Sequence, residues 1–370
     1  MEQWGSAKEI RRYVKTREKQ LKGKNIPQEA YRTTMENGEN VAEFDDLHTC
    51  FFTDRGVVRS VSGVSFAIPM GKTVAVVGES GCGKSVTSLS LMGLLQRPQG
   101  QITGGALRLN LGDHAVDIAK TPEQVMQQIR GRVVSMIFQE PMTALNPVLT
   151  VGAQVAEAVQ LHDPKCSTAE LARKRVAELL ARVGIPDPER VAKSYPHALS
   201  GGMRQRVMIA MALAGDPRLI IADEPTTALD VTIQKQILEL LGQVKEQSGC
   251  SVLLITHDLG VVAAMADLVV VMYAGRVVEQ GTVQEIFKTP AHPYTLGLMA
   301  AKPVVGKPVE RLYSIPGRVP DPIELPPHCY FRQRCDHAGE DCDGEYPCVV
   351  SLSETHKVSC YRSVKEDDHG

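Results

Sequence analysis

The stretch that decides the fold runs from Thr73 to Ser85 and reads TVAVVGESGCGKS. It begins with a short apolar run, which predicts a buried strand, and continues into the pattern G-x-x-x-x-G-K-[ST] from Gly78. Glycines let the backbone N–H groups curl around phosphates, and a helix that starts at Lys84 adds the partial positive charge of its N-terminus. The stretch therefore predicts a strand, a phosphate-binding loop and a helix.

The side chains of this loop fit the chemistry of a nucleotide bound with magnesium. Lys84 carries a mobile positive charge for the β- and γ-phosphates, and Ser85 offers a hydroxyl to Mg²⁺. The loop implies ATP and Mg²⁺ as cofactors. The nucleotide-binding residues expected in and beside it are Gly78, Ser80, Gly81, Gly83, Lys84, Ser85 and Val86.

Two acids follow a second apolar run, at residues 219–222. A buried strand would carry Asp223 and Glu224 to its C-terminal edge, where ligands bind in open α/β sheets. We expect Asp223 to hold Mg²⁺ through a water and Glu224 to polarise the attacking water as general base. His257 ends the next apolar strand, and we expect its neutral imidazole to orient that water by a hydrogen bond to the γ-phosphate.

Further apolar runs alternate with helical segments along the chain. Strands are expected at 133–139, 251–257 and 268–273, and helices between about 154 and 183. Continuous apolar strands that alternate with helices predict a parallel sheet covered on both faces. From about Val41 to the phosphate loop the pattern is β-like instead, so a separate β-subdomain is expected before the parallel core.

Composition and charge exclude some classes of protein. The formal net charge of −2 over 370 residues argues against a general nucleic-acid binder, which would be basic. No apolar run reaches the roughly 18 residues that span a bilayer, and the first residues lack a signal-peptide pattern. We therefore expect a cytoplasmic protein whose membrane role comes through a partner.

The first 40 residues are polar, with a run rich in Lys and Arg from Lys8 to Lys24. A weak helical stripe there is compatible with a solvated helix or with a contact to an anionic membrane or a partner. Beyond Thr289 prolines become frequent. This end of the chain is expected to be a loop-rich appendage, too poor in apolar residues to be held by core packing alone.

Five of the nine cysteines lie close together near the C-terminus, at Cys329, Cys335, Cys342, Cys348 and Cys360. In a reducing compartment such a group indicates a metal rather than disulfides. Four thiolates suit Zn²⁺ or an iron–sulfur cluster, and the gaps here are wider than those of most zinc sites. The spacing favours a cluster, with zinc and with free or disulfide-bonded thiols as open alternatives.

A second helix start with bare N–H groups comes at residues 199–206, which read LSGGMRQR. Ser200, Gly201 and Gly202 would form another anion site, which makes sense if it serves the nucleotide of another subunit. The segment resembles the signature motif of the ATP-binding cassette (ABC) ATPases. That resemblance implies that Gln139 is the Q-loop glutamine, which also reaches Mg²⁺, that 228–230 is the D-loop with Asp230 at the nucleotide, and that His257 is the switch histidine. The adenine-stacking aromatic falls at Phe51, with Phe52 as the neighbouring candidate.

Other segments resemble the oligopeptide and dipeptide importer branch of that family. They are 137–147, 292–295, 315–317 and 329–335, and Met203 stands where the generic signature has Gln, as in that branch. The resemblance also implies that four cysteines hold a [4Fe–4S] cluster, namely Cys329, Cys335, Cys342 and Cys360. Cys348 is left as an extra. No phosphate-contacting motif follows His257, so ATP binding is expected to be independent of this segment.

The fold expected is α/β: a P-loop (RecA-like) ABC nucleotide-binding domain with an antiparallel β-subdomain and a helical subdomain, plus a small Cys-rich extension. We expect an N-terminal extension at 1–40, the nucleotide-binding domain at 41–290 with helical subdomain at about 142–215, and the extension at 291–370. Two such cassettes would close head to tail around ATP.

The resemblance implies a place at the cytoplasmic face of the cell membrane. The expected partners are a second, paralogous ABC ATPase subunit, two transmembrane permease subunits and an extracytoplasmic substrate-binding protein, without nucleic acid. Alternatives to peptide import are nickel or metallophore import, glutathione import, a non-transport ABC ATPase, and a module that holds ATP without cleaving it.

Overall fold

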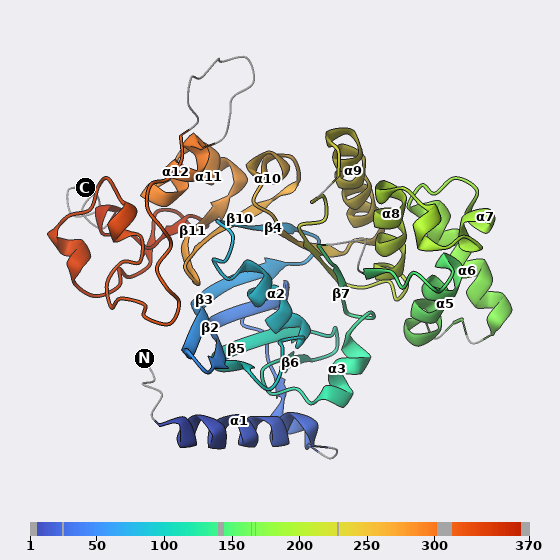
Figure 1. Cartoon of the computed structure of the whole chain (residues 1–370), viewed down its shortest axis with the longest axis horizontal. Helices are drawn as coiled ribbons and strands as arrows, with labels where there is room; N and C mark the ends of the chain where they lie inside the picture. Colours follow the sequence, from blue (N-terminus) through green and yellow to red (C-terminus); the bar gives the residue numbers. More distant parts are fainter. Residues whose placement is uncertain are drawn as a thin grey trace.

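The computed structural model describes residues 6–23, 26–139, 144–163, 165–166, 168–227, 229–301 and 313–363. Two sheets and the helices around them form the body of the chain (Figure 1). The strands are β1 Arg32–Thr33, β2 Asn40–Thr53, β3 Gly56–Pro69, β4 Thr73–Val77, β5 Gly100–Asn110, β6 Ala115–Asp117, β7 Val134–Ile137, β8 Leu219–Asp223, β9 Ser251–Ile255, β10 Leu268–Tyr273, β11 Arg276–Thr282, β12 Val350–Ser351 and β13 Lys357–Val358. The helices are α1 Ala7–Lys22, α2 Lys84–Met92, α3 Glu123–Ile129, α5 Val151–His162, α6 Ala169–Arg182, α7 Pro188–Ala192, α8 Gly201–Ala212, α9 Val231–Ser248, α10 Leu259–Met265, α11 Val283–Lys288 and α12 Pro293–Ala300.

The larger sheet has eight strands in the order β12-β13-β11-β10-β4-β9-β8-β7. Its middle, from β10 to β7, is parallel throughout, as the apolar runs predict. Alternate residues of β4 enter two different core clusters: Ala75 and Val77 enter one, and Val74 and Val76 enter the other. The sheet is thus covered on both faces. The loops that follow β4, β7, β8 and β9 all begin at the edge where the carboxyl ends of these parallel strands lie.

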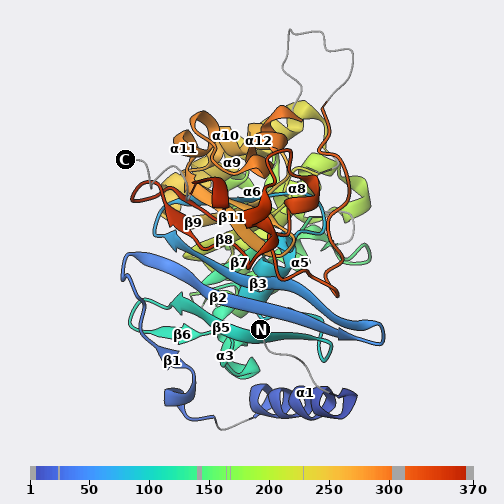
Figure 2. The ribbon, with the colours of Figure 1, turned by 90° about the vertical axis from the view of Figure 1, so that its left-hand side faces the viewer.

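The smaller sheet is antiparallel, with five strands in the order β1-β6-β5-β2-β3. Its main element is the long hairpin of β2 and β3 (Figure 2). The sheet shares a core with α2 and α3, through residues such as Leu91 and Met126. The expected β-subdomain before the phosphate loop is therefore present.

Helices α5 to α8 form a group at one side of the molecule (Figure 1). Their apolar residues, among them Val155, Leu179 and Ile209, belong to the core cluster on the other face of the parallel sheet. This group corresponds to the expected helical subdomain, although its expected first residue, Met142, lies outside the described residues.

Helix α1 lies along the antiparallel sheet at the end of the molecule opposite α11 and α12 (Figures 1 and 2). Leu21 is buried, and the Tyr13 ring packs edge-on against Phe52 with centroids 6.0 Å apart. The Arg17 guanidinium donates to the carbonyl of Ala119 at 2.9 Å. The apolar stripe of α1 therefore packs against the chain itself. Neither interpretation of the sequence had included this contact.

The C-terminal segment joins the main sheet, because β13 pairs antiparallel with β11. Tyr330 and Phe331 are buried in the same core cluster as the parallel sheet. The segment is therefore held partly by core packing, because two adjacent aromatic side chains bury apolar surface against the main core. None of the described helices combines the length and hydrophobicity needed to span a bilayer.

Candidate nucleotide site

The phosphate loop follows β4 and ends in α2, the arrangement that its sequence predicts. Two of its glycines have positive φ and no room for a side chain. A Cβ at Gly78 would lie 2.2 Å from the Met272 carbonyl oxygen, and a Cβ at Gly83 would lie 2.4 Å from the Ser60 carbonyl oxygen. Both positions therefore require glycine for conformational and steric reasons.

Lys84 is buried, and its Nζ donates to the carbonyl oxygens of Gly78 at 2.8 Å and Glu79 at 3.0 Å. The ammonium group thus lies inside the curve of its own loop. Ser80 and Gly81 are exposed at the outer turn of the loop. Val86 is half-buried and packs against the core beneath the antiparallel sheet, so its side chain supports the start of α2.

Ser85 and Asp223 meet across the sheet edge, where the Ser85 hydroxyl donates to Oδ1 of Asp223 at 3.2 Å. Burial raises the pKa of the Asp223 carboxyl, and the hydrogen bond from Ser85 opposes that rise. Hydroxyl and carboxylate oxygens are ligands that Mg²⁺ accepts in proteins. The two residues therefore fit a magnesium ion at this edge.

The carboxylate of Glu224 is surrounded by three donors. Gln139 Nε2 lies 2.7 Å from Oε2, the Thr227 hydroxyl lies 2.9 Å from Oε2, and His257 Nδ1 lies 3.1 Å from Oε1. Burial tends to raise the pKa of Glu224, but the hydrogen bonds from His257 and Thr227 hold the pKa below its usual value. The carboxylate is therefore ionised at neutral pH, as a proton acceptor must be.

This cluster comes from three neighbouring strands. Gln139, Glu224 and His257 each follow the carboxyl end of β7, β8 or β9, and these strands are adjacent in the sheet. Two of the three predicted catalytic residues, Gln139 and His257, thus contact the third, Glu224. Thr227 was not among the predicted residues, and only its place three residues after Glu224, in the same turn, indicates it.

The two aromatic candidates point to different neighbours. The Phe51 ring packs against the core that contains α2 and would touch a Cβ at Gly100. The Phe52 ring instead contacts Tyr13 of α1. Phe51 therefore lies on the side of the hairpin that shares a core with the helix of the phosphate loop.

The residues predicted to form a second anion site lie apart from the phosphate loop, because α8 stands well to the side of α2 (Figure 1). Ser200 caps α8, and its hydroxyl accepts a hydrogen bond from the Met203 N–H at 3.3 Å. Gly201 is exposed, whereas a Cβ at Gly202 would lie 2.7 Å from Ile233. Asp230 caps α9. The first D-loop residue, Ala228, lies outside the described residues, as do Glu140 to Thr143 after the Q-loop glutamine.

The four predicted cysteine ligands line one small cavity of about 30 Å³, together with His292 and His337. Burial, together with the neighbouring thiols of Cys342, Cys360 and Cys335, raises the pKa of Cys329 to about 11. Cys348 is exposed and lines a different cavity. Within the described residues no group of three His, Cys, Asp or Glu side chains is arranged to hold a single metal ion.

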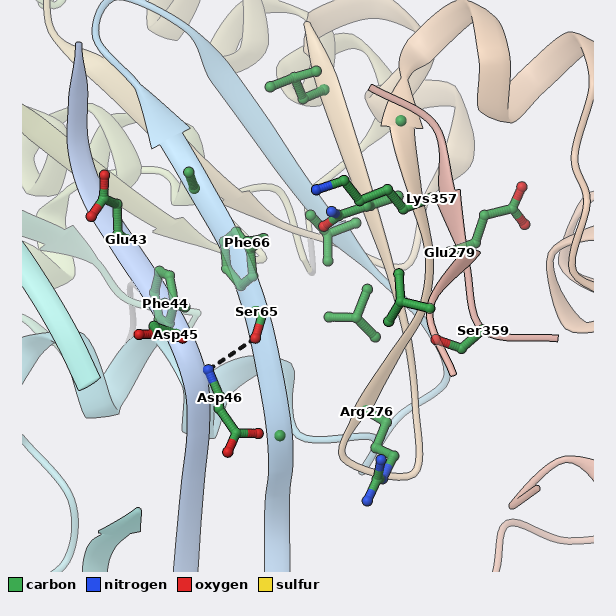
Figure 3. Close-up of a pocket in the computed structure, with 18 of the residues that line it drawn as sticks. Glu43, Phe44, Asp45, Asp46, Ser65, Phe66, Arg276, Glu279, Lys357 and Ser359 are labelled. Carbon is green, nitrogen blue, oxygen red and sulfur yellow. Dashed lines mark hydrogen bonds between the residues drawn. The ribbon is translucent and has the colours of Figure 1, made fainter. Parts of the chain in front are cut away.

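A cavity of about 850 Å³ lies elsewhere, between the β2–β3 hairpin and the strands β11 and β13. Figure 3 shows Phe44 and Asp46 on one wall and Lys357 and Ser359 on the other. No residue of the phosphate loop lines it. The cavity is therefore not part of the nucleotide site, although it is far larger than the one among the cysteines.

Comparisons with known proteins agree with this geometry. Residues 61–227 match the family model described as ABC transporter, and residues 278–342 match the oligopeptide/dipeptide transporter C-terminal region. The oligopeptide transport ATP-binding protein AppD of Bacillus subtilis is 50% identical over 319 residues, which are 86% of this chain and 95% of AppD. The dipeptide transport ATP-binding protein DppD of the same organism is 49% identical over 331 residues, which are 90% of this chain and 97% of DppD.

Solved structures agree as well. The ATP-binding cassette MJ0796, solved as a dimer in a post-hydrolysis state bound to ADP and Pi, superposes with a TM-score of 0.57 and 28% identity. The match covers 65% of this chain and 98% of that cassette. This chain therefore contains nearly the whole of that cassette together with further residues that the cassette lacks.

Proposed function

Because the chain belongs to the oligopeptide/dipeptide branch of the ABC transporter ATP-binding subunits, it hydrolyses ATP, and we propose that this hydrolysis powers the import of peptides. The observation that carries the peptide assignment is the match of residues 278–342 to the C-terminal region of oligopeptide and dipeptide transporters.

In the proposed mechanism each ATP lies between two cassettes. Lys84 holds the β- and γ-phosphates, while Ser85 and Asp223 hold Mg²⁺ together with Gln139. The Ser200 region and Asp230 of this chain close over the nucleotide of the second subunit. The separation of α8 from α2 supports this arrangement, because the second N–H cradle stands away from the chain's own phosphate loop. ATP binding would close the pair and hydrolysis would reopen it.

In the proposed chemistry Glu224 accepts a proton from a water molecule, the water oxygen bonds to the γ-phosphorus, and the bond from that phosphorus to the bridging oxygen of the leaving ADP breaks. His257 and Gln139, which both donate to Glu224, would keep the water and the γ-phosphate aligned. The loop after Gln139 would pass the change of state to the membrane subunits. These roles follow from contacts among three side chains at one edge of the sheet.

We propose that the second cassette is a paralogous subunit, and that two permease subunits and an extracytoplasmic binding protein complete the machine. Family membership supports a place at the cytoplasmic face of the membrane. The proposed division of the chain is an N-terminal extension at 1–40, the cassette at 41–290 and the C-terminal extension at 291–370.

Peptide import is tested by purifying the chain with the subunits that accompany it and reconstituting them in vesicles. We expect two permeases and a second ATPase in the complex, and ATP-dependent uptake of a labelled peptide when the binding protein is present. Omission of the binding protein is the control. Uptake of nickel chelates or glutathione, but of no peptide, would refute the peptide assignment and leave the ATPase role intact.

The position of Phe51 gives a second prediction. Phe51→Ala should weaken ATP binding by about 1–3 kcal/mol, since stacking of a base on an aromatic ring contributes about that much. The matched control is Phe52→Ala, which removes an adjacent ring that contacts α1 instead. Isothermal titration with Mg-ATP measures both. Equal weakening by the two variants, or weakening by Phe52→Ala alone, would reject Phe51 as the adenine partner.

We also propose that Cys329, Cys335, Cys342 and Cys360 hold a [4Fe–4S] cluster. The donor set fits, because the four thiols line one cavity and a cluster spans more space than a single ion. Burial raises the pKa of Cys329, Cys335 and Cys360, so a metal would have to displace their protons, since metal ligation requires the thiolate. When bound, the cluster would supply cross-links between the loops. ATP hydrolysis itself transfers no electrons, so we assign the cluster a structural role.

A further inference from the structure

A buried arginine connects the cysteine-bearing segment to the phosphate loop. The Arg334 side chain is 4% exposed and forms a bidentate ion pair with Glu79. Its Nη1 lies 2.6 Å from Oε2 of Glu79, and its Nη2 lies 2.8 Å from Oε1. Such parallel N–H···O bonds are the strongest and most directional contacts that a guanidinium makes.

The partner of this arginine is a residue of the phosphate loop itself. Glu79 follows Gly78, and its carbonyl oxygen accepts the hydrogen bond from Lys84. Its backbone N–H donates to the Tyr294 hydroxyl at 2.8 Å. The side chain, the N–H and the C=O of Glu79 are therefore all fixed, and two of the three partners come from beyond residue 290.

The segment that carries Arg334 is fixed by aromatic packing and by hydrogen bonds. The ring of Phe331 packs against Tyr273 and Tyr294, with centroids 5.2 Å and 5.4 Å apart. All three rings are buried. Arg334 also donates from Nε to the Pro316 carbonyl oxygen at 2.8 Å, so the guanidinium is held from several sides at once.

Charge makes this contact matter for nucleotide binding. Glu79 places a negative charge in a loop whose ligand is a polyphosphate, and like charges at short range repel strongly where water is scarce. Arg334 neutralises that charge. The Glu79 side chain is 28% exposed, so the pair is only partly buried, and removal of Arg334 would leave the Glu79 carboxylate without its neighbouring positive charge.

We propose that Arg334 is a positioning residue of the nucleotide site, which neutralises and holds Glu79 so that the affinity for ATP depends on the C-terminal segment. The inference rests on the proposed nucleotide site at Lys84. It replaces the expectation from sequence that ATP binding is independent of everything beyond His257. The sequence does not indicate this contact, because Arg334 belongs to no phosphate-binding motif and reaches the loop only through the fold.

The test is a double-mutant cycle in the full chain, with the dissociation constant for Mg-ATP as readout. Arg334→Gln should raise that constant on the order of tenfold, the size expected for contacting charged groups. Arg334→Lys should retain part of the affinity. Glu79→Gln combined with Arg334→Gln should recover most of the loss, because no unpaired carboxylate then remains in the phosphate loop.

Arg332→Gln is the matched control. Arg332 lies two residues away in the same turn, but it pairs with Asp343, at 2.6 Å, rather than with the phosphate loop. Its substitution should leave the dissociation constant unchanged. In the assembled transporter, Arg334→Gln should raise KM for ATP more than it lowers kcat, since it acts on binding rather than on the general base.

Two results would overturn the inference: an unchanged dissociation constant in Arg334→Gln, or a double variant as weak as the single one. The second result would mean that Arg334 only supports the folding of the segment. Lys84→Ala serves as the reference. If Lys84→Ala loses ATP while Arg334→Gln binds normally, only this inference fails. If Lys84→Ala binds normally, the nucleotide site itself has been misplaced.

Discussion

Glu224→Gln is expected to slow ATP hydrolysis by the assembled transporter about 10²–10⁴-fold, the usual cost of losing a general base. Glutamine keeps the size of the side chain but accepts no proton from water. ATP binding should remain, because Lys84, Ser85 and Asp223 are unchanged. The pKa of Glu224 is held below its usual value, so protonation of this base should reduce turnover in the wild type only below the pH range usual for a glutamate.

The variant should also trap the closed pair of ATPase subunits when ATP is added, which a cross-link across the interface can detect. Ser200→Arg in the same background is the control, because it should block closure over the second subunit's nucleotide while sparing ATP binding at Lys84. Wild-type turnover by Glu224→Gln would refute the assignment of the base. Closure that survives Ser200→Arg would refute the shared site.

The nucleotide site could be predicted because most of its residues belong to short contiguous motifs at the ends of strands. Apolar runs gave the positions of β4, β8 and β9, and parallel strands bring their carboxyl ends to one edge. Asp223 and Glu224 therefore had to lie near the phosphate loop. The resemblance to ABC ATPases added Gln139, whose contact with Glu224 no periodicity indicates.

The remaining contacts could not be predicted from the sequence, since they join residues far apart in the chain. Arg334 and Glu79 are separated by 255 positions. Glu79 occupies a variable position of the phosphate-loop pattern, and Arg334 stands in a segment without regular periodicity. Strands β12 and β13 have two residues each, too few to show an alternating pattern. Helix α1 shows its stripe, but the stripe does not reveal that it packs on the chain's own sheet.

Replacement of any of the four proposed cluster ligands by serine is expected to abolish iron binding. Anaerobically purified wild-type protein should be brown and carry about four irons per chain, as a Cys₄-ligated [4Fe–4S] cluster requires. Cys329→Ser, Cys335→Ser, Cys342→Ser and Cys360→Ser should be colourless. Cys348→Ser is the matched control and should stay brown, because Cys348 is exposed and lies outside the cavity that the other four line.

These variants have a second readout, because Cys329 and Cys335 flank the turn that carries Arg334. Loss of the metal removes cross-links whose binding energy supports local folding. The turn should then loosen, and the dissociation constant for Mg-ATP should rise toward that of Arg334→Gln, whereas Cys348→Ser should bind ATP as the wild type does.

Stoichiometric zinc without iron would overturn the cluster. Iron lost in Cys348→Ser but kept in Cys342→Ser would overturn only the choice of ligands. Iron-free Cys335→Ser protein with unchanged affinity for ATP would show that the phosphate loop is held by the packing of Phe331 and Arg334 alone.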